Sequence, residues 1–166
     1  DSVRTEIRIY NVGSSEFRSV KTGFSGIPYG ITFLDNGGIS VISSEGMNVF
    51  SSSLQLLGEY YTENDVYCYS VSEDASVLVH TDEKTLKNKI IMFDKKGNIS
   101  YNNIIAEKVL DVRMSGEYLF VQTPGGFFRI NTSRQGDIKE IKQVTSDFKM
   151  LICDSERILI CGSSYA

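Results

Sequence analysis

Short runs of alternating apolar and polar residues, separated by polar turns, follow one another along the whole chain. One apolar run, IIMF, ends at Asp94; the polar turn KKGN follows, and apolar positions resume at Ile99 and Tyr101. Period-two patterning on both sides of a turn that contains Gly and Asn predicts a β-hairpin. Similar hairpins are predicted within residues 7–20, 47–56 and 127–141. Corresponding apolar positions of the four lie about 40, 43 and 37 residues apart, a spacing typical of propeller repeats.

A second series of hairpins alternates with the first. Its turns read DNGG, SEDAS, SGE and DSER, and the strands that follow begin near Ile39, Val77, Leu119 and Ile158. These strands are apolar on both faces, so we expect them to be central strands that are covered on both sides. The strands after the KKGN-type turns carry more Ser, Lys, Gln and Glu, which suits outer edge strands. An inner apolar hairpin followed by an outer polar one, four times over, predicts the blades of a β-propeller.

The two series divide one domain, residues 1–166, into about four blade equivalents. Three units contain both hairpins: about 31–61, 66–105 and 109–145. Residues 1–21 supply an outer hairpin alone and residues 148–162 an inner hairpin alone, so that together they complete a fourth blade. Three assemblies stay open: a ring closed by one chain, an eight-bladed ring of two chains, and part of a longer propeller. The rival fold is an all-β sandwich, which also has short, evenly spaced strands.

The segments MFDKKGNI and SEDASVLVHT resemble blades of the WD-repeat-like and quinoprotein-like β-propeller superfamily. In that superfamily an apolar strand commonly ends in Asp or Asn and is followed by Gly and an apolar residue. The chain has no Trp, so it lacks both the WD dipeptide and the Trp-docking pattern of the quinone-cofactor alcohol dehydrogenases. The sequence also resembles the extracytoplasmic propeller part of Gram-positive bacterial proteins with one membrane anchor. That resemblance implies an extracytoplasmic domain held by an anchor outside this segment, with the cytoplasm as the alternative.

Composition narrows the classes of partner. The chain has 166 residues, 41% of them hydrophobic, which is enough for one domain with a buried core. Its net charge of −4 argues against nucleic acid or an anionic membrane as the partner. No apolar run approaches the roughly 18 residues that span a bilayer, and we expect no direct membrane contact by this segment. The three cysteines, Cys68, Cys153 and Cys161, lack CxxC spacing and are predicted to be reduced core residues.

No catalytic, metal or cofactor site is predicted. His80 is the only histidine, which excludes multi-histidine metal sites and leaves any catalytic triad dependent on it. The Gly-rich segments GFSGIPYG and PGG lack the lysine pattern of phosphate-binding loops. The adjacent carboxylates Asp82 and Glu83 lack the further oxygen ligands of a calcium loop and suit a solvated turn. The stretch from Glu83 to Lys89 is the one weak helical candidate, too short to be stable alone.

Tyrosines gather around the connector TEND, residues 62–65. Tyrosine is favoured at recognition surfaces, although it is equally favoured in strands. In a propeller this connector and the 81–89 loop would lie at the same end of the ring, which is the usual ligand face. The predicted binding residues at that end are Tyr29, Tyr61, Tyr67, His80 and Asp82.

The sequence leaves three hypotheses for the function, each from a different class of protein. The first is a non-catalytic binding or scaffolding propeller that recognises a protein or peptide on one ring face, with a homodimer as a possible assembly; this rests on analogy of fold. The second is a carbohydrate-active lyase or hydrolase, whose acidic residues would have to converge near the axis from several blades. The third is a structural module of a membrane-anchored assembly.

Overall fold

The computed structural model of the chain describes residues 5–10, 12–132, 138–141, 148–152 and 158–162, and every regular element within these ranges is a β-strand. Consequently, the described part holds no helix long and apolar enough to cross a membrane. The expected all-β fold is confirmed. The helical candidate from Glu83 to Lys89 is wrong: residues 82–87 form a turn, closed by a hydrogen bond from the Leu86 amide to the Asp82 carbonyl (2.8 Å), and a strand begins at Asn88.

The strands form five antiparallel sheets that follow one another in chain order. Sheet I consists of β1 (Glu6–Tyr10) and β2 (Phe17–Lys21). Sheet II consists of β3 (Pro28–Phe33), β4 (Ile39–Ser43), β5 (Gly46–Phe50) and β6 (Leu56–Tyr61). Sheet III consists of β7 (Cys68–Val71), β8 (Ala75–Thr81), β9 (Asn88–Asp94) and β10 (Ile99–Ile105). Sheet IV consists of β11 (Asp111–Ser115), β12 (Tyr118–Thr123), β13 (Gly126–Asn131) and β14 (Ile138–Ile141), and sheet V of β15 (Phe148–Ile152) and β16 (Ile158–Gly162).

Burial follows the hydrophobic pattern of each strand. All five residues of β4 are buried, as are six of the seven residues of β8 and five of the six residues of β12. The fourth strand of sheet II, β6, and that of sheet III, β10, are largely exposed. The predicted division into covered central strands and exposed outer strands is therefore confirmed for sheets II and III. The predicted polar composition is seen in β10, which carries Ser and Asn, but not in β6, whose sequence LLGEYY is mainly apolar and aromatic.

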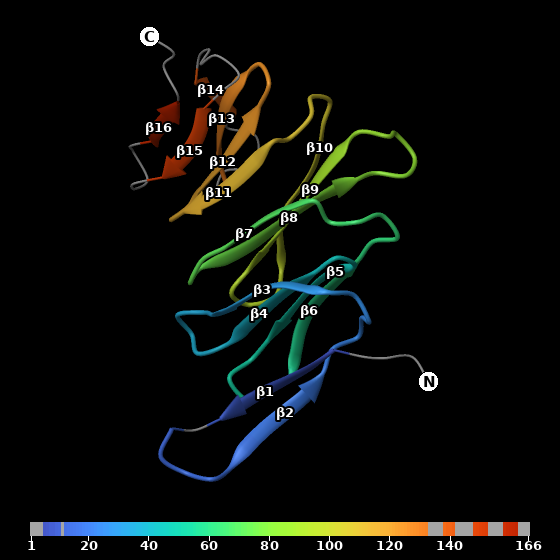
Figure 1. Cartoon of the computed structure of the whole chain (residues 1–166), viewed down its shortest axis with the longest axis vertical. Coiled ribbons are helices and arrows are strands. Elements are labelled where there is room, and N and C mark those ends of the chain that lie inside the picture. The colour runs from blue at the N-terminus through green and yellow to red at the C-terminus, as the bar shows by residue number, and fades with distance from the viewer. Residues whose placement is uncertain (1–4, 11, 133–137, 142–147, 153–157, 163–166) are drawn as a thin grey trace.

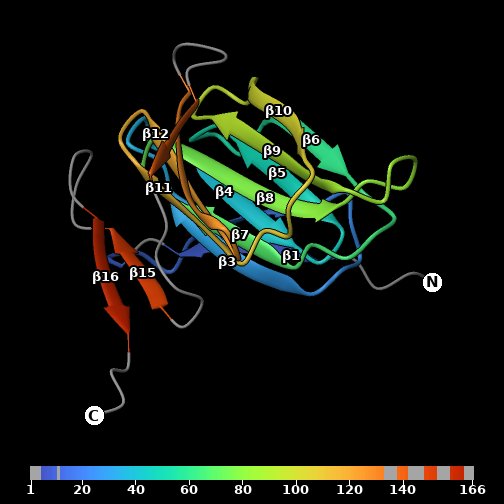
Figure 2. The same cartoon turned by 90° about the horizontal axis from the view of Figure 1, so that it is seen from above.

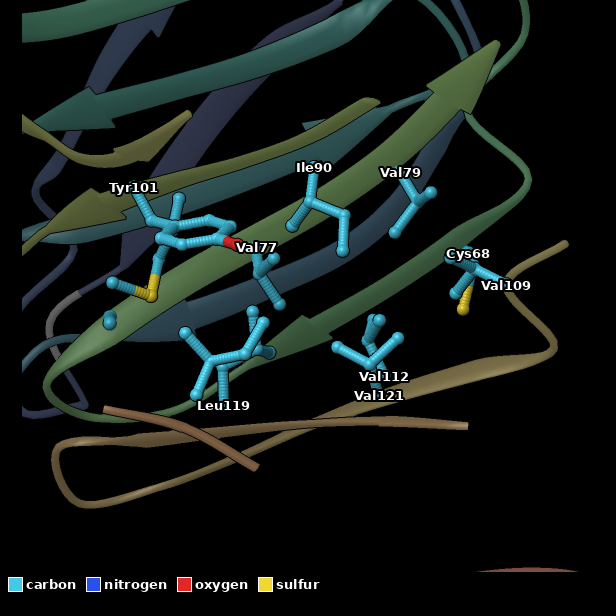
Figure 3. Packing of buried hydrophobic residues seen from close by; sticks show 12 residues of the cluster. Cys68, Val77, Val79, Ile90, Tyr101, Val109, Val112, Leu119 and Val121 are labelled. Carbon is cyan, nitrogen blue, oxygen red and sulfur yellow. The ribbon is translucent and has the colours of Figure 1, made fainter. Parts of the chain in front are cut away.

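Neighbouring sheets pack face to face, and sheet III is covered on both faces. On β8, Leu78 belongs to a cluster with Val49 of sheet II. Val77 and Val79 alternate with Leu78 and belong to a cluster with Val121 of sheet IV (Figure 3). Burying one Val or Leu side chain contributes about 1.5–3 kcal/mol. This double covering is the arrangement of propeller blades, whereas each sheet of a sandwich is covered on one face only.

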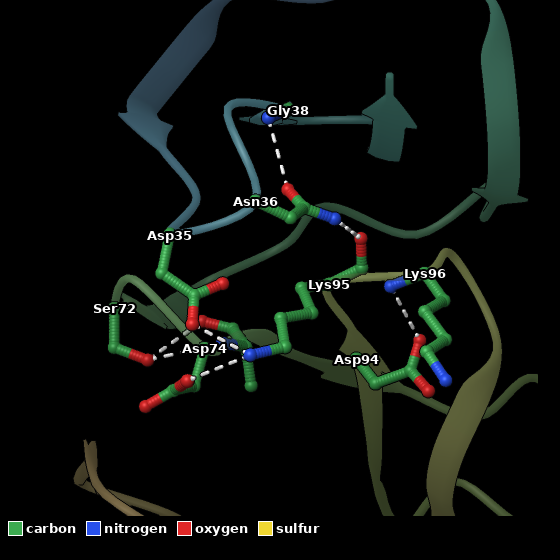
Figure 4. Close-up of polar contacts among 9 residues, drawn as sticks. Asp35, Asn36, Gly38, Ser72, Asp74, Asp94, Lys95 and Lys96 are labelled. Carbon is green, nitrogen blue, oxygen red and sulfur yellow. Dashed lines mark hydrogen bonds and ion pairs between the residues drawn. The ribbon is translucent and has the colours of Figure 1, made fainter. Parts of the chain in front are cut away.

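Polar contacts join sheets II and III at the turns between paired strands. The Lys95 ammonium lies 2.6 Å from the Asp35 carboxylate and 3.5 Å from that of Asp74 (Figure 4). The Asn36 side-chain amide donates to the Lys95 carbonyl at 2.8 Å. The hydrogen bond that Lys95 donates to the Asp35 carboxylate raises the pKa of Lys95, but these groups are solvent-exposed and such ion pairs contribute little to stability. They connect the β3–β4 turn of sheet II to the β9–β10 turn of sheet III.

The two-stranded sheets lie at opposite ends of the row of sheets. Figure 1 shows β1 and β2 in blue at one end and β15 and β16 in red at the other, and Figure 2 shows β15 and β16 set apart from the stacked sheets. In the described strands, β1 pairs with β2 alone and β16 with β15 alone. A fourth blade built from both hairpins is thus not assembled within one described chain.

Candidate functional site

Because consecutive strands of each sheet are antiparallel, the described loops of sheets II to IV divide between two ends of the molecule. The connector end, as we name it, carries the described links between sheets (residues 22–27, 62–67 and 106–110) and the β4–β5, β8–β9 and β12–β13 turns. The hairpin end carries the end of β1 and the β3–β4, β5–β6, β7–β8, β9–β10 and β11–β12 turns. Hydrogen bonds confirm this division: the Asn64 side chain in one connector donates to the Thr81 carbonyl at the end of β8 (2.9 Å). The connector 62–65 and the 81–89 loop therefore meet at one end, as predicted.

His80 lies beneath the surface of the connector end and is 4% exposed. Its Nε2 lies 2.7 Å from the Tyr60 hydroxyl, and its Nδ1 lies 2.9 Å from the Thr81 carbonyl and 3.0 Å from Thr62 Oγ1. A carbonyl oxygen can only accept, so Nδ1 carries the proton and Nε2 accepts from Tyr60. Both ring nitrogens are occupied, and His80 holds β8, β6 and the connector together.

Burial lowers the pKa of His80, with nearby Lys89 acting in the same direction, while the Thr81 carbonyl, Asp82 and Glu83 act against it. Unfolded His80 takes up a proton as the pH falls through about 6.5, whereas the folded side chain resists protonation. The unfolded state therefore binds more protons in this window, and stability decreases as pH falls below about 6.5. Because His80 is the only histidine, we expect denaturant titrations to show lower stability at about pH 6 than at about pH 7.5. The His80→Gln variant should lose most of that difference; equal differences in both proteins would contradict the assignment.

Tyr29 and Tyr69 stack on each other where β3 of sheet II meets β7 of sheet III. Their ring centroids are 5.9 Å apart at an angle of 18°, and the Tyr69 hydroxyl donates to the Tyr29 carbonyl at 2.7 Å. A β-bulge between Pro28 and Gly30 turns the Tyr29 side chain toward this contact. A side chain on Gly30 would collide with the Tyr69 ring. Glycine is therefore required here for room, not for an unusual backbone angle.

Tyr67 is linked through Asn88 of sheet III to the connector that follows β10, at the same end. Its hydroxyl donates to Asn88 Oδ1, and the Asn88 side-chain amide donates to the Glu107 carbonyl, both at 2.5 Å. Burial is the main cause that raises the pKa of Tyr67 to about 12, so the hydroxyl stays a neutral donor. The ring remains 44% exposed and is available to a partner.

Tyr61 borders a shallow depression of about 470 Å³ that is also lined by Glu45, Thr62 and Glu63. Its ring packs edge-on against Phe24, with centroids 6.3 Å apart, and its hydroxyl donates to Glu59 at 3.1 Å. A methyl group on Gly23 would overlap the Tyr61 hydroxyl. The depression thus combines one half-exposed aromatic ring with carboxylates from the β4–β5 turn and the connector.

The structure brings the five predicted residues to one end of the molecule in different environments. Tyr29, Tyr61 and Tyr67 are partly exposed, while His80 is enclosed. Asp82 caps the exposed 82–87 turn by accepting from the Thr85 amide (3.0 Å) and hydroxyl (2.8 Å), which lowers its pKa. Their role in binding stays a prediction. Glu45 and Asn88 were missed because a lone Glu or Asn in a turn carries no signal in one sequence.

No three His, Cys, Asp or Glu side chains within the described ranges gather as a metal ion requires. Cys68 is buried and free, as predicted, and burial raises the pKa of its thiol to about 11. Such a thiol is a poor nucleophile. The side chain of Cys161 and the whole of Cys153 lie outside the described residues.

No family model matches the sequence, and the search of curated proteins found no match. Solved structures do match. The WD40 domain of Neurospora crassa Pan2 is 12% identical with a TM-score of 0.57, over 87% of this chain and 49% of that chain. Saccharomyces cerevisiae Sqt1 is 13% identical with a TM-score of 0.59, over 97% of this chain and 51% of that chain. BamB from Moraxella catarrhalis is 18% identical with a TM-score of 0.55, over 85% of this chain and 46% of that chain.

These likenesses show the fold. The similarity to these WD40 and BamB structures confirms the predicted β-propeller fold. Sheets II, III and IV are complete blades, and sheets I and V are half-blades. The chain spans about half the length of the solved chains it matches. Its sheets therefore correspond to part of these larger propellers.

Proposed function

We propose that this chain is a non-catalytic binding domain that recognises a protein or peptide at its connector end. The observation that carries the proposal is the set of three partly exposed tyrosines there, each held by a neighbour. Tyr29 stacks on Tyr69, Tyr61 rests against Phe24, and Tyr67 bonds to Asn88. Rings that are already fixed lose little conformational freedom on binding, and tyrosine is enriched at recognition surfaces.

The depression beside Tyr61 supports a partner with basic side chains. Glu45 and Glu63 line it together with the phenol ring. A Lys or Arg side chain entering it would meet carboxylates and an aromatic face, which attracts cations. The net charge of −4 favours the approach of such a segment. We therefore infer a peptide segment that carries at least one Lys or Arg.

Selection of peptides from a random display library on the immobilised chain tests the proposal. We expect the selected peptides to be enriched in Lys and Arg. In titrations followed by fluorescence anisotropy, Tyr61→Ala should weaken their binding about tenfold or more, as loss of a central aromatic contact does. The matched control is Tyr10→Ala, because Tyr10 is an exposed tyrosine at the far end of β1, on the hairpin end. Peptides that bind Tyr61→Ala as tightly as the unchanged chain, or that lose affinity only with Tyr10→Ala, would refute the proposed surface.

A further inference from the structure

Two large apolar side chains on β3 are exposed although their cross-strand partners are buried. Ile31 is 60% exposed and Phe33 65% exposed, while Val41 and Ile39, which lie opposite them on β4, are 1% and 2% exposed. Residues directly opposite each other in an antiparallel pair lie on the same face of the sheet. Val41 and Ile39 belong to the cluster with Ile7 of β1. Ile31 and Phe33 therefore lie on the face of sheet II that is directed toward sheet I, but on a part of that face that sheet I does not cover.

The equivalent positions of the next two sheets are covered. Tyr69 and Val71 of β7 are partly buried and pack in the cluster between sheets II and III. On β11, Val112 is fully buried and Met114 is partly buried in the cluster between sheets III and IV. In both cases the covering comes from a complete preceding sheet. In the described residues, the sheet before sheet II consists of β1 and β2, so no strands at the two inner blade positions cover this part of β3.

Sheet I also has an unused edge. Among the described strands, β1 pairs only with β2, from Glu6 opposite Lys21 to Tyr10 opposite Phe17. The strand in its position in sheets II to IV, namely β5, β9 or β13, pairs on both sides. An unpaired edge of this kind is a template for another strand. A pair of strands added at β1 would complete a four-stranded blade and cover Ile31 and Phe33.

Sheet V is a pair of the kind that this surface lacks. β15 and β16 occupy the inner two positions of a blade, and in the described residues β16 pairs with β15 alone. Their sequences, FKMLI and ILICG, are predominantly apolar, as inner strands are. Within one molecule sheets I and V are separate and lie at opposite ends of the row (Figure 1). In this arrangement the chain's own sheet V does not reach β1.

We propose that the free edge of β1 and the exposed face of β3 receive the β15–β16 pair of a second copy of this chain. β16 of each copy runs antiparallel to β1 of the other, and two copies close head to tail into one ring. Each junction adds a strand ladder to an apolar contact that includes Ile31 and Phe33. The contact is heterologous, and it closes because the second junction repeats the first. This inference is independent of the function proposed for the connector end.

Light scattering coupled to size exclusion, over a wide range of protein concentration, tests the proposal. We expect a mass of twice the 18.6 kDa of one chain. Phe33→Lys should give the mass of a single chain, because a charge cannot be buried unpaired at the junction. The matched control is Ile104→Lys, on the exposed outer strand β10, which should stay a dimer. A single-chain mass for the unchanged protein at all concentrations would overturn the proposal, since it would mean closure by the chain itself or by another polypeptide; so would a mass above two chains.

Hydrogen exchange of the unchanged protein provides a test that needs no folded variant. The amides of β1 that point away from β2 should exchange more slowly at concentrations where the dimer forms than at high dilution. Amides of β10, which is the edge of a complete sheet, should exchange at the same rate at both concentrations. Exchange of β1 that does not depend on concentration, in a sample with the mass of two chains, would place the interface elsewhere and refute the proposal.

Discussion

Replacing Leu119 by alanine is expected to lower the free energy of unfolding by about 2–5 kcal/mol. Leu119 is fully buried and lies on β12 in the cluster that joins sheets III and IV, together with Val77 and Ile130. The substitution removes apolar contacts and leaves a cavity that rigid β-strands cannot collapse to fill. Denaturant titration monitored by circular dichroism measures the loss.

Leu56→Ala is the matched control for this experiment. Leu56 begins the outer strand β6 and is 49% exposed. A substitution there should change the free energy of unfolding by no more than about 0.5 kcal/mol. If both variants lost the same amount of stability, β12 would not be the covered central strand that the structure shows.

Gly97→Ala is expected to destabilise the chain by about 2–5 kcal/mol. Gly97 has φ of +81°, which disfavours any residue with a Cβ atom. It also lies against the backbone of β6: a methyl group would come within 2.6 Å of the Leu57 carbonyl carbon and 2.8 Å of the Gly58 amide nitrogen. The two sheets would have to separate at their hairpin ends, and the Asp35–Lys95 contact beside them would weaken. Thermal unfolding, compared with the unchanged chain, measures the effect.

Gly116→Ala separates the effect of backbone strain from the effect of steric contact with β6. Gly116 also has a positive φ, +54°, and also lies in a turn at the hairpin end, but no atom lies within 4 Å of the position of its missing Cβ. Its substitution should cost only the backbone strain of about 1–2 kcal/mol. Equal losses at both glycines would mean that the close approach of sheets II and III at Gly97 does not exist.

The alternation of apolar and polar residues predicted most of the fold. The strands around Val41, Val77 and Leu119 were predicted to be covered on both faces, and the structure buries them on both faces. The polar turns in the sequence marked where each hairpin reverses direction. The start of β3 was missed: the sequence suggested residue 31, but the strand begins at Pro28 and contains a bulge. A bulge depends on pairing with β4, and no local pattern in the sequence records it.

The candidate site was predicted only in part. The tyrosines drew attention to the connector end, but the same pattern did not distinguish enclosed His80 from exposed Tyr61, since both lie near the end of a strand. The roles of Gly23 and Gly30 depend on aromatic rings that arrive from 38 and 39 residues away in the sequence, at Tyr61 and Tyr69. The exposure of Ile31 and Phe33 depends on which strands lie against sheet II, and no composition or spacing within β3 records that.

The covering of β8 on both faces is the central claim, and methyl nuclear Overhauser effects test it most directly. The structure predicts cross-peaks from the Leu78 methyl groups to the sheet II side chains of its cluster, which include Val49, and from the Val79 methyl groups to the sheet IV side chains of its cluster, which include Val121. Both sets should appear in one spectrum, because alternate residues of one strand face different neighbouring sheets. If one of the two sets is missing and that face of β8 contacts solvent, the sheets form two layers and not the blades of a propeller.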